Sequence, residues 1–413
     1  MRVFGMLTAL LLAAPTALHA QANRPLPRAA ATALNADYDR TVAELIRITE
    51  TPAPPFKERV RAELFAKMLR DLGLKEVEID AEGNVTALRP GTGDGRLFAV
   101  SAHLDTVFPE GTPIKVRREG DRLMAPGIGD DSLGLASLLA WARALDAAKV
   151  TTKRGILFVG TVGEEGAGDL RGVRHLFTKS RYKDRIGAFM SVDGSDASRI
   201  VNAAVGSRRY RLSFTGPGGH SYGAFGTVNP MAAMADTVRG LYAIDVPKTP
   251  KTTYAASVVS GGTSVNAIPD KITLDIDMRS PDKAALATLE SRMLAAADAA
   301  VTAENAARST RDGSIEVAKQ LIGDRPAGDT DPANPLVVSA MAAARSAGLT
   351  PKLESSSTDS NIPMSLDIPA LTIGSGASGG RSHSLDEFLD VERGAFVRGL
   401  SMGLTLILDA ANR

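Results

Sequence analysis

Six side chains that could bind a divalent metal ion stand at the ends of apolar runs or beside glycines. They are His103, Asp130, Glu164, Glu165, Asp193 and His383. Imidazole nitrogens combined with carboxylate oxygens suit zinc, cobalt or manganese, whereas calcium prefers a shell made only of oxygen. Each residue alone has an ordinary structural explanation, but six in such positions do not share one. The set therefore predicts a metal centre.

Three short apolar runs must deliver most of these side chains. They read LFAV at 97–100, GILFVGT at 155–161 and AFMSV at 188–192. His103, Glu164 and Asp193 follow these runs in turn. Such runs, alternating with helical patterns like the one over 133–145, predict an α/β fold with a mostly parallel sheet. Because parallel strands end along one edge of a sheet, these side chains are expected to converge there.

Two of the local motifs allow more than one role. Side chains at i and i+2 on a strand point the same way, so Asp105 is expected to hold the second ring nitrogen of His103. Asp130 and Asp131 follow a glycine-rich loop and precede an apolar helix. They could cap that helix, or the glycines could let the loop aim a carboxylate inward. The residues alone leave both interpretations open.

The composition excludes several classes of function. The chain has 413 residues, 44% of them hydrophobic and 23% charged, which suits a soluble protein of two or three domains. Its net charge is +1, so nothing predicts nucleic acid as a partner. The absence of cysteine excludes a disulfide framework, a thiolate metal site and a cysteine nucleophile. Ser221 and Ser384 lie outside any Gly-x-Ser-x-Gly frame, so a serine hydrolase is not predicted.

Residues 1–22 have the pattern of a secretory signal peptide. Arg2 precedes an apolar core over 5–17, and Ala20 and Ala22 are candidate cleavage positions. An uncleaved anchor is the less favoured alternative, because the apolar run is short for a membrane span. We therefore expect a periplasmic or secreted protein that has no stable membrane anchor after cleavage.

The pattern changes after residue 206, which predicts a second domain. Residues 209–215 and 271–279 alternate between apolar and polar side chains, as strands of a half-solvated sheet do. An inserted α+β domain would then interrupt the catalytic domain. The expected ranges are 30–206 and 323–413 for the two catalytic parts and 207–322 for the insert.

In their order along the chain, the motifs resemble those of the co-catalytic di-zinc exopeptidases. That family includes peptidase T, glutamate carboxypeptidase, aminoacylase and succinyl-diaminopimelate desuccinylase. The matching motifs are His103-Leu104-Asp105, Gly129-Asp130-Asp131, Gly163-Glu164-Glu165-Gly166, Val192-Asp193-Gly194, Gly218-Gly219-His220-Ser221, Thr358-Asp359-Ser360-Asn361 and Ser382-His383-Ser384. Any one of them is weak, but the ordered set covers essentially the whole chain after residue 22.

The resemblance implies a zinc-exopeptidase catalytic domain that binds two divalent metal ions. These would be Zn²⁺, with Co²⁺ or Mn²⁺ as alternatives. Asp130 would bridge the ions, His103 and Asp193 would complete one shell, and Glu165 and His383 the other. The resemblance also implies a cis peptide bond after Asp130.

Further roles follow from the same resemblance. Glu164 would be the general base for a hydroxide shared by the two metals, and Asp105 would orient His103. His220 would stabilise the oxyanion from the inserted lid, often that of a partner subunit, so a homodimer through the lid is expected. Arg279 and Asn266 would bind a carboxylate or polar group of the substrate.

One position departs from the pattern of the family. Ser132 stands where many relatives have a lysine two residues after the bridging aspartate. No expected ligand is affected, but a substrate preference cannot be transferred on this motif.

The predicted function is hydrolysis of short peptides by a metal-dependent exopeptidase. An amidohydrolase that deacylates N-acyl amino acids would use the same site and is the first alternative. A catalytically dead peptide- or metal-binding protein is the second. Glu164 argues against it, because binding alone requires no general base.

Overall fold

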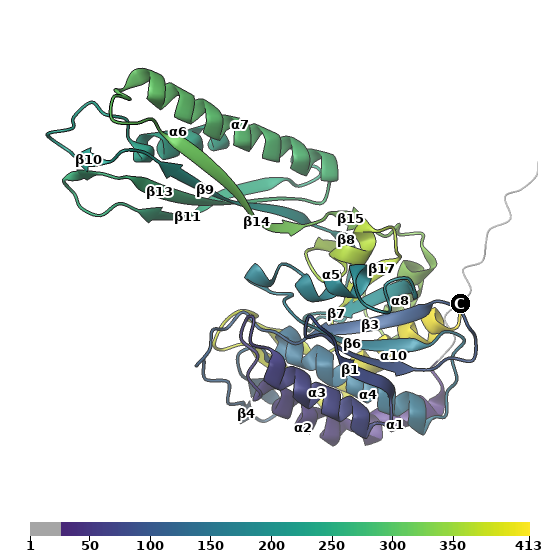
Figure 1. The fold of residues 1–413 in the computed structure, drawn as a ribbon. Coiled ribbons are helices and arrows are strands. Elements are labelled where there is room, and N and C mark those ends of the chain that lie inside the picture. The colour runs from purple at the N-terminus through teal and green to yellow at the C-terminus, as the bar shows by residue number, and fades with distance from the viewer. Residues whose placement is uncertain (1–25) are drawn as a thin grey trace, which may run out of the picture.

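The structure is a computed structural model that describes residues 26–413, so the predicted signal peptide lies outside the described residues. Figure 1 shows two bodies. The larger one contains a mixed sheet covered by helices, and the smaller one contains a four-stranded sheet with two helices on one side.

The large sheet has the strand order β1-β2-β6-β3-β7-β17-β8-β15, and β16 pairs with β8. Its strands are β1 (Lys75–Ile79), β2 (Val85–Arg89), β3 (Leu97–His103), β6 (Ile156–Thr161), β7 (Ile186–Val192), β8 (Arg199–Ala204), β15 (Gly328–Asp329), β16 (Lys352–Ser356) and β17 (Ala370–Ile373). The central strands β6, β3, β7 and β17 are mutually parallel. The predicted mostly parallel sheet is therefore confirmed.

Alternate side chains of the central strands enter two separate cores. On β3, Phe98 and Val100 face one core and Leu97 and Ala99 the other. Burying a side chain such as Phe98 contributes about 1.5–3 kcal/mol. The first core is covered by α1 (Arg28–Ala36), α2 (Tyr38–Thr49), α3 (Arg59–Asp71), α4 (Leu133–Ala147), α8 (Pro335–Ser346) and α10 (Arg393–Ala411), and the second by α5 (Arg171–Thr178) and α9 (Asn361–Ser365).

Helix α10 is a core helix, although among the described residues it alone is long and apolar enough to cross a membrane. Within its apolar window, 67% is buried inside the protein. The indole nitrogen of Trp141 donates to the carbonyl oxygen of Leu400 at 2.8 Å, and the indole ring lies directly against Gly403. A Cβ at Gly403 would come within 2.2 Å of that ring, so this contact requires glycine.

A small antiparallel sheet brings the C-terminal part of the chain beside the loop that carries Asp130. Its strands, in order, are β18 (Ser378–Gly380), β19 (Phe388–Asp390), β5 (Arg122–Met124) and β4 (Arg117–Glu119). Arg122 forms a two-point ion pair with Asp390 across β5 and β19, at 2.8 and 3.0 Å. The sheet fixes the segment that contains His383 next to η1 (Ile128–Ser132).

The smaller body, which we call the lid, is an antiparallel sheet with the order β11-β13-β9-β14. Its elements are β9 (Gly206–Thr215), β10 (Gly219–His220), α6 (Pro230–Tyr242), β11 (Thr253–Gly261), β12 (Ala267–Ile268), β13 (Lys271–Ser280), α7 (Lys283–Ala307) and β14 (Glu316–Arg325). Alternate residues of β9 and β13, such as Phe214 and Ile276, pack against α6 and α7. The expected boundary between residues 322 and 323 falls inside β14, which continues to Arg325.

Candidate metal centre

Three adjacent strands end at the same place and deliver four of the predicted residues. His103 is the last residue of β3, Glu164 and Glu165 follow β6, and Asp193 follows β7. The order β6-β3-β7 makes these strands neighbours, so their carboxyl ends lie side by side. The predicted convergence at this edge of the sheet is what the structure shows.

Asp130 and His383 reach the same place from loops and complete two overlapping groups. In one group, ligand atoms of His103, Asp130 and Asp193 all lie within 4.8 Å of one another. In the other, the same holds for Asp130, Glu165 and His383. Asp130 belongs to both groups, which is the position that a bridging carboxylate requires.

The orientation of Asp130 fits two cations rather than one. Its Oδ1 lies 2.8 Å from Nε2 of His103, and its Oδ2 lies 3.1 Å from Nε2 of His383. The same nitrogen of His383 lies 2.9 Å from Oε1 of Glu165. Metal–ligand bonds of about 2.0–2.2 Å place neighbouring ligand atoms at comparable separations. The donor set therefore fits a pair of divalent ions with one carboxylate oxygen directed to each.

The electrostatics of the protein chain alone also favour cations at this site. Burial, reinforced by the charge of Asp130, raises the pKa of Asp193 to about 7. Burial likewise raises the pKa of Glu164 well above its usual range, although Arg325 opposes the shift. Hydrogen bonds to Asp130 and Glu165 raise the pKa of His383 to about 10. Crowded, buried carboxylates favour a bound proton or a metal ion over the bare charge.

Asp105 differs from its predicted contact. Nδ1 of His103 lies 3.0 Å from the backbone oxygen of Asp105, while the Asp105 carboxylate is 3.8 Å from that nitrogen. The carboxylate instead accepts hydrogen bonds from the backbone nitrogens of Glu164, at 3.1 Å, and Glu165, at 2.8 Å. The structure thus has the Asp105 backbone orient the imidazole, and the Asp105 side chain hold the loop with the two glutamates.

Asp131 forms hydrogen bonds with the backbone at both of its carboxylate oxygens. One carboxylate oxygen accepts from the backbone nitrogen of His103 at 2.9 Å, and the other accepts from that of Gly134, in the first turn of α4, at 3.2 Å. A Cβ at Gly134 would lie 2.3 Å from the Asp131 carboxylate, so glycine leaves room for it. The Asp130–Asp131 peptide bond is cis, as expected from the resemblance.

Glu387 supports the Asp130 loop and was missed by the sequence reasoning. Its buried carboxylate accepts from the backbone nitrogens of Gly127, Gly129 and Asp130 at 2.9, 2.7 and 2.9 Å. Burial raises the pKa of Glu387 to about 7. The only local signal is its place four residues after His383, since its partners are backbone groups more than 250 residues away.

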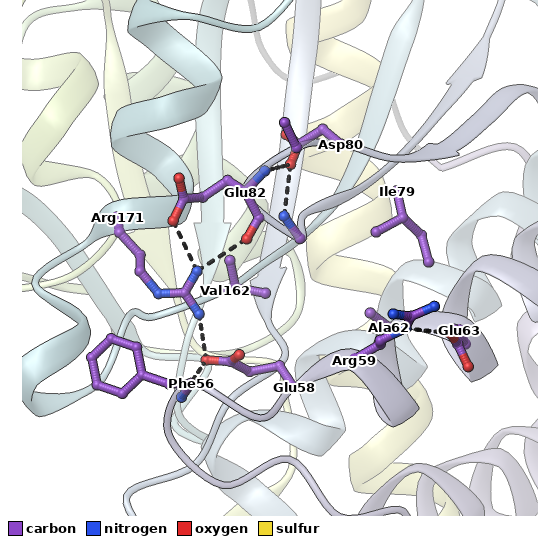
Figure 2. A pocket seen from close by; sticks show the side chains of 12 residues that line it. Phe56, Glu58, Arg59, Ala62, Glu63, Ile79, Asp80, Glu82, Val162 and Arg171 are labelled. Atoms are coloured by element: carbon purple, nitrogen blue, oxygen red, sulfur yellow. Dashed lines mark hydrogen bonds and ion pairs between the residues drawn. The ribbon is translucent and has the colours of Figure 1, made fainter.

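Arg171 supports the glutamate loop at Gly163, the residue before Glu164. Figure 2 shows its guanidinium between Glu58, at 2.7 Å, and Glu82, at 3.0 Å. The aliphatic part of the side chain lies against Gly163, where a Cβ would come within 2.6 Å. Arg171, Glu58 and Glu82 line a cavity of about 720 Å³ whose lining contains none of the metal-ligand candidates. Arg171 therefore supports the backbone immediately before Glu164.

A second cavity, of about 410 Å³, opens onto the cluster and contains one of the two predicted substrate-binding residues. Arg279 lines it, together with Arg199, Arg209 and Arg325. Asp277 lies between two of these arginines and accepts from Nε of Arg209 at 3.1 Å and from Nε of Arg279 at 2.7 Å. Val107 has the only apolar side chain among the residues that line this cavity. The cavity is thus polar and basic beside the carboxylates.

His220 and Asn266 lie together at the tip of the lid, and neither lines that cavity. His220 is on β10, which Figure 1 places at the far end of the lid from the large sheet. It is exposed, and its Nδ1 accepts from the backbone nitrogens of Tyr222 and Gly223. The backbone oxygen of Asn266 accepts from the nitrogen of Ser221 at 2.9 Å. Both Asn266 and Arg279 were expected to bind the substrate, but only Arg279 lines the cavity beside the cluster.

The chain matches one peptidase family model and is similar in structure to several peptidases and to an amidase. The sequence model of peptidase family M20/M25/M40 matches residues 99–409. The aminopeptidase PepT from Bacillus cereus is similar in structure, with a TM-score of 0.73 at 23% identity, over 91% of this chain and 99% of that one. The YxeP protein of Bacillus subtilis, described as a dinuclear metal-binding peptidase of the M20 family, gives 0.67 at 18% identity, over 91% and 99%. A hydantoinase/carbamoylase family amidase from Burkholderia ambifaria gives 0.62 at 20% identity, over 92% and 98%.

Proposed function

The chain belongs to peptidase family M20/M25/M40, and from this premise we propose that it is an exopeptidase that hydrolyses short peptides with two divalent metal ions. The observation that carries the proposal is the position of Asp130, one oxygen of which faces His103 and the other His383. His103 and Asp193 would hold one ion, and Glu165 and His383 the other. Zinc suits this donor set, and cobalt or manganese are the alternatives.

Two bound ions supply a water of lowered pKa and polarise the scissile carbonyl group. Glu164 then has the role of general base: it takes the proton of the attacking water and passes it to the leaving amine. Its side chain is buried and close enough to His103 and Glu165 for their ligand atoms to lie within 4.8 Å. Burial keeps the pKa of Glu164 high, which suits a group that must accept a proton and release it.

We propose that the substrate carries a free carboxylate, which Arg279 binds. Nε of Arg279 donates to Asp277, and Arg279 lines the cavity, so its two terminal nitrogens are left to bind a substrate group. A guanidinium fork binds a carboxylate through two parallel hydrogen bonds. Both the peptide and the N-acyl amino acid provide such a group. The amidohydrolase alternative is therefore supported by the similar amidase and is kept as the second candidate function.

His220 would reach a cavity only from a partner, so we propose a homodimer through the lid. Within its own chain His220 lies at the lid tip, outside the cavity lining. The edge strand β11 exposes Val258 and Val259, each at 55%, and the loop after His220 exposes Tyr222 and Phe225 at 89% and 86%. An unpaired strand edge beside exposed apolar side chains is a surface suited to a second copy.

The dimer is tested by sedimentation of the full chain and of Val259→Lys. We expect a dimer for the parent and a shift towards monomer for the variant, since an edge lysine opposes strand pairing. Thr273→Lys, on the interior strand β13, is the control for a lysine elsewhere in the same sheet. A parent chain that sediments as a monomer would refute the dimer.

The proposed activity is tested with a panel of dipeptides, tripeptides, end-blocked peptides and N-acyl amino acids, with added zinc, cobalt or manganese. We expect turnover of short unblocked peptides that a chelator abolishes and added metal restores. Turnover of N-acyl amino acids alone would establish the second candidate function. No turnover of any substrate by metal-loaded protein would favour a dead binding protein.

We also propose that the protein is exported, on the pattern of residues 1–22. Arg2, the apolar core over 5–17 and the small residues Ala20 and Ala22 support this proposal. A mature chain in the periplasm or the culture medium that begins just after one of these alanines is expected. A chain recovered from the cytoplasm with Met1 intact would contradict it.

A further inference from the structure

The lid contributes one buried charge to the catalytic body. Arg325, the last residue of β14, is 5% exposed. Its Nη1 donates to Oε1 of Glu164 at 3.3 Å and to Oγ of Ser357 at 3.1 Å, and its Nη2 donates to the backbone oxygen of Glu164. One guanidinium thus holds both the side chain and the backbone of the proposed base.

Arg325 lies at the hinge between the two bodies. The chain enters the lid at Val205–Gly206 and leaves it at Arg325–Pro326. Both connections are held by Asn361, whose side-chain nitrogen donates to the backbone oxygens of Val205 and Pro326 at 3.0 Å each. Asn361 is fully buried in the catalytic body, so its hydrogen bonds hold both connections of the lid to that body.

Neighbouring residues tie the same glutamate loop to the lid. Both carboxylate oxygens of Asp169 accept from the backbone nitrogen of Asp324, at 2.9 and 3.1 Å. Arg209, on β9 of the lid, donates to the backbone oxygen of Gly166 at 3.0 Å. Gly163 of the same loop lies against the side chain of Arg171, which Figure 2 shows bound to Glu58 in the catalytic body. The loop that carries Glu164 is therefore fastened to both bodies.

We propose that Arg325 is a positioning residue that sets the orientation of Glu164 and makes it depend on the lid hinge. The proposal rests on the proposed role of Glu164 as general base. A displacement of about 1 Å in a reacting group can cost about 100-fold in rate. A rotation of β14 about the hinge would move Arg325, and Glu164 would follow because the guanidinium grips its carboxylate and its carbonyl.

The planar guanidinium is suited to this role and lysine is not. Arg325 makes separate hydrogen bonds through its two terminal nitrogens, to a carboxylate, a carbonyl and a hydroxyl. Lysine would keep the positive charge but offers one nitrogen on a flexible stem. The conservative replacement should therefore restore only part of the effect.

The test compares Arg325→Met with Arg325→Lys in the full metal-loaded chain. For Arg325→Met we expect kcat to fall by about 100-fold with KM within about 3-fold of the parent and unchanged metal content, because the orientation of the base is lost rather than binding. Arg325→Lys should recover about 10-fold of that loss. The matched control is Arg208→Met, since Arg208 pairs with Asp324 at 2.9 Å on the lid and touches no proposed ligand or base.

A double variant separates positioning from general damage. If Arg325 acts through Glu164, adding Arg325→Met to Glu164→Gln should lower kcat no further than Glu164→Gln alone. Additive losses, an equal loss in Arg208→Met, or loss of metal in Arg325→Met would overturn the proposal. Thermal unfolding of each variant identifies a folding defect. If Arg325→Met fails to fold, Arg325→Lys replaces it in the comparisons with the parent and with Glu164→Gln. Failure of the proposed function is distinct, because the parent itself would then show no turnover.

Discussion

The two sheets of this protein carry their functional side chains in opposite ways. In the large sheet they follow the ends of parallel strands and are buried, as with His103 and Glu165. In the lid they stand on an exposed tip or on the face of a strand, as with His220 and Arg279. The backbone of the large sheet fixes its cluster before any substrate arrives. The lid groups depend instead on the hinge or on a second copy.

The largest expected effect is in the buried cluster. Asp130→Ala should reduce the metal content of the purified chain and lower turnover by about 1000-fold or more, because metal ions supply several kcal/mol of transition-state stabilisation. Elemental analysis and the peptide assay measure both. Asp236→Ala, which changes a half-buried aspartate on lid helix α6 far from the cluster in sequence, is the control and should retain both. Retained metal in Asp130→Ala would place the ions elsewhere.

The lid histidine is expected to act in the partner's cavity. His220→Ala should lower turnover by about 100-fold without loss of metal, the usual effect of removing one oxyanion donor. A doubly tagged heterodimer of His220→Ala with Glu164→Gln should recover about half of the parent turnover, because one of its two sites is then complete. If this heterodimer is inactive while the parent is active, His220 does not cross between chains.

Glu387 is expected to matter through the metal rather than through the substrate. Glu387→Ala releases three backbone nitrogens of the Asp130 loop. Loss of such a supporting group typically weakens metal affinity by about 10- to 100-fold. Competition with a metal indicator measures this, and Glu387→Gln, which can still accept hydrogen bonds, should lose less. An unchanged affinity in Glu387→Ala would show that the loop does not need this support.

Arg279 should produce the smallest effect, confined to one class of substrate. Arg279→Met is expected to raise KM by about 10-fold for substrates with a free carboxylate, since hydrogen bonds to charged groups contribute about 1.5–3 kcal/mol. Carboxamide analogues should be unaffected. Arg211→Met removes a neighbouring arginine that is paired with Asp275 in the same sheet, and it should alter neither. An equal rise in KM for both substrate classes would refute carboxylate recognition.

The sequence was informative where chemistry and secondary structure share one short motif. The ligands at the ends of β3, β6 and β7 could be predicted because an apolar run ends within four residues of each. In each case the signal and the structure that it predicts are local.

The groups that hold the ligands in place were not predictable, because their partners are backbone atoms far along the chain. Arg61 lies within the amphipathic pattern of α3, yet it is 1% exposed and donates to the carbonyl oxygens of Thr51 and Leu104, each at 2.9 Å. Burial lowers its pKa to about 10. The Asp105 carboxylate and Arg325 are similar, since each finds its contacts only after separate loops have come together. The local pattern of residue types therefore does not predict such contacts.

We propose above that the cluster holds the metal ions and that Glu164 transfers the proton. The most direct test is Glu164→Gln, measured for metal content and for turnover of the best substrate in the panel. We expect the variant to keep the metal content of the parent while its kcat falls by about 100- to 10,000-fold, the range that general base catalysis supplies. Turnover within about 3-fold of the parent, with metal retained, would contradict it.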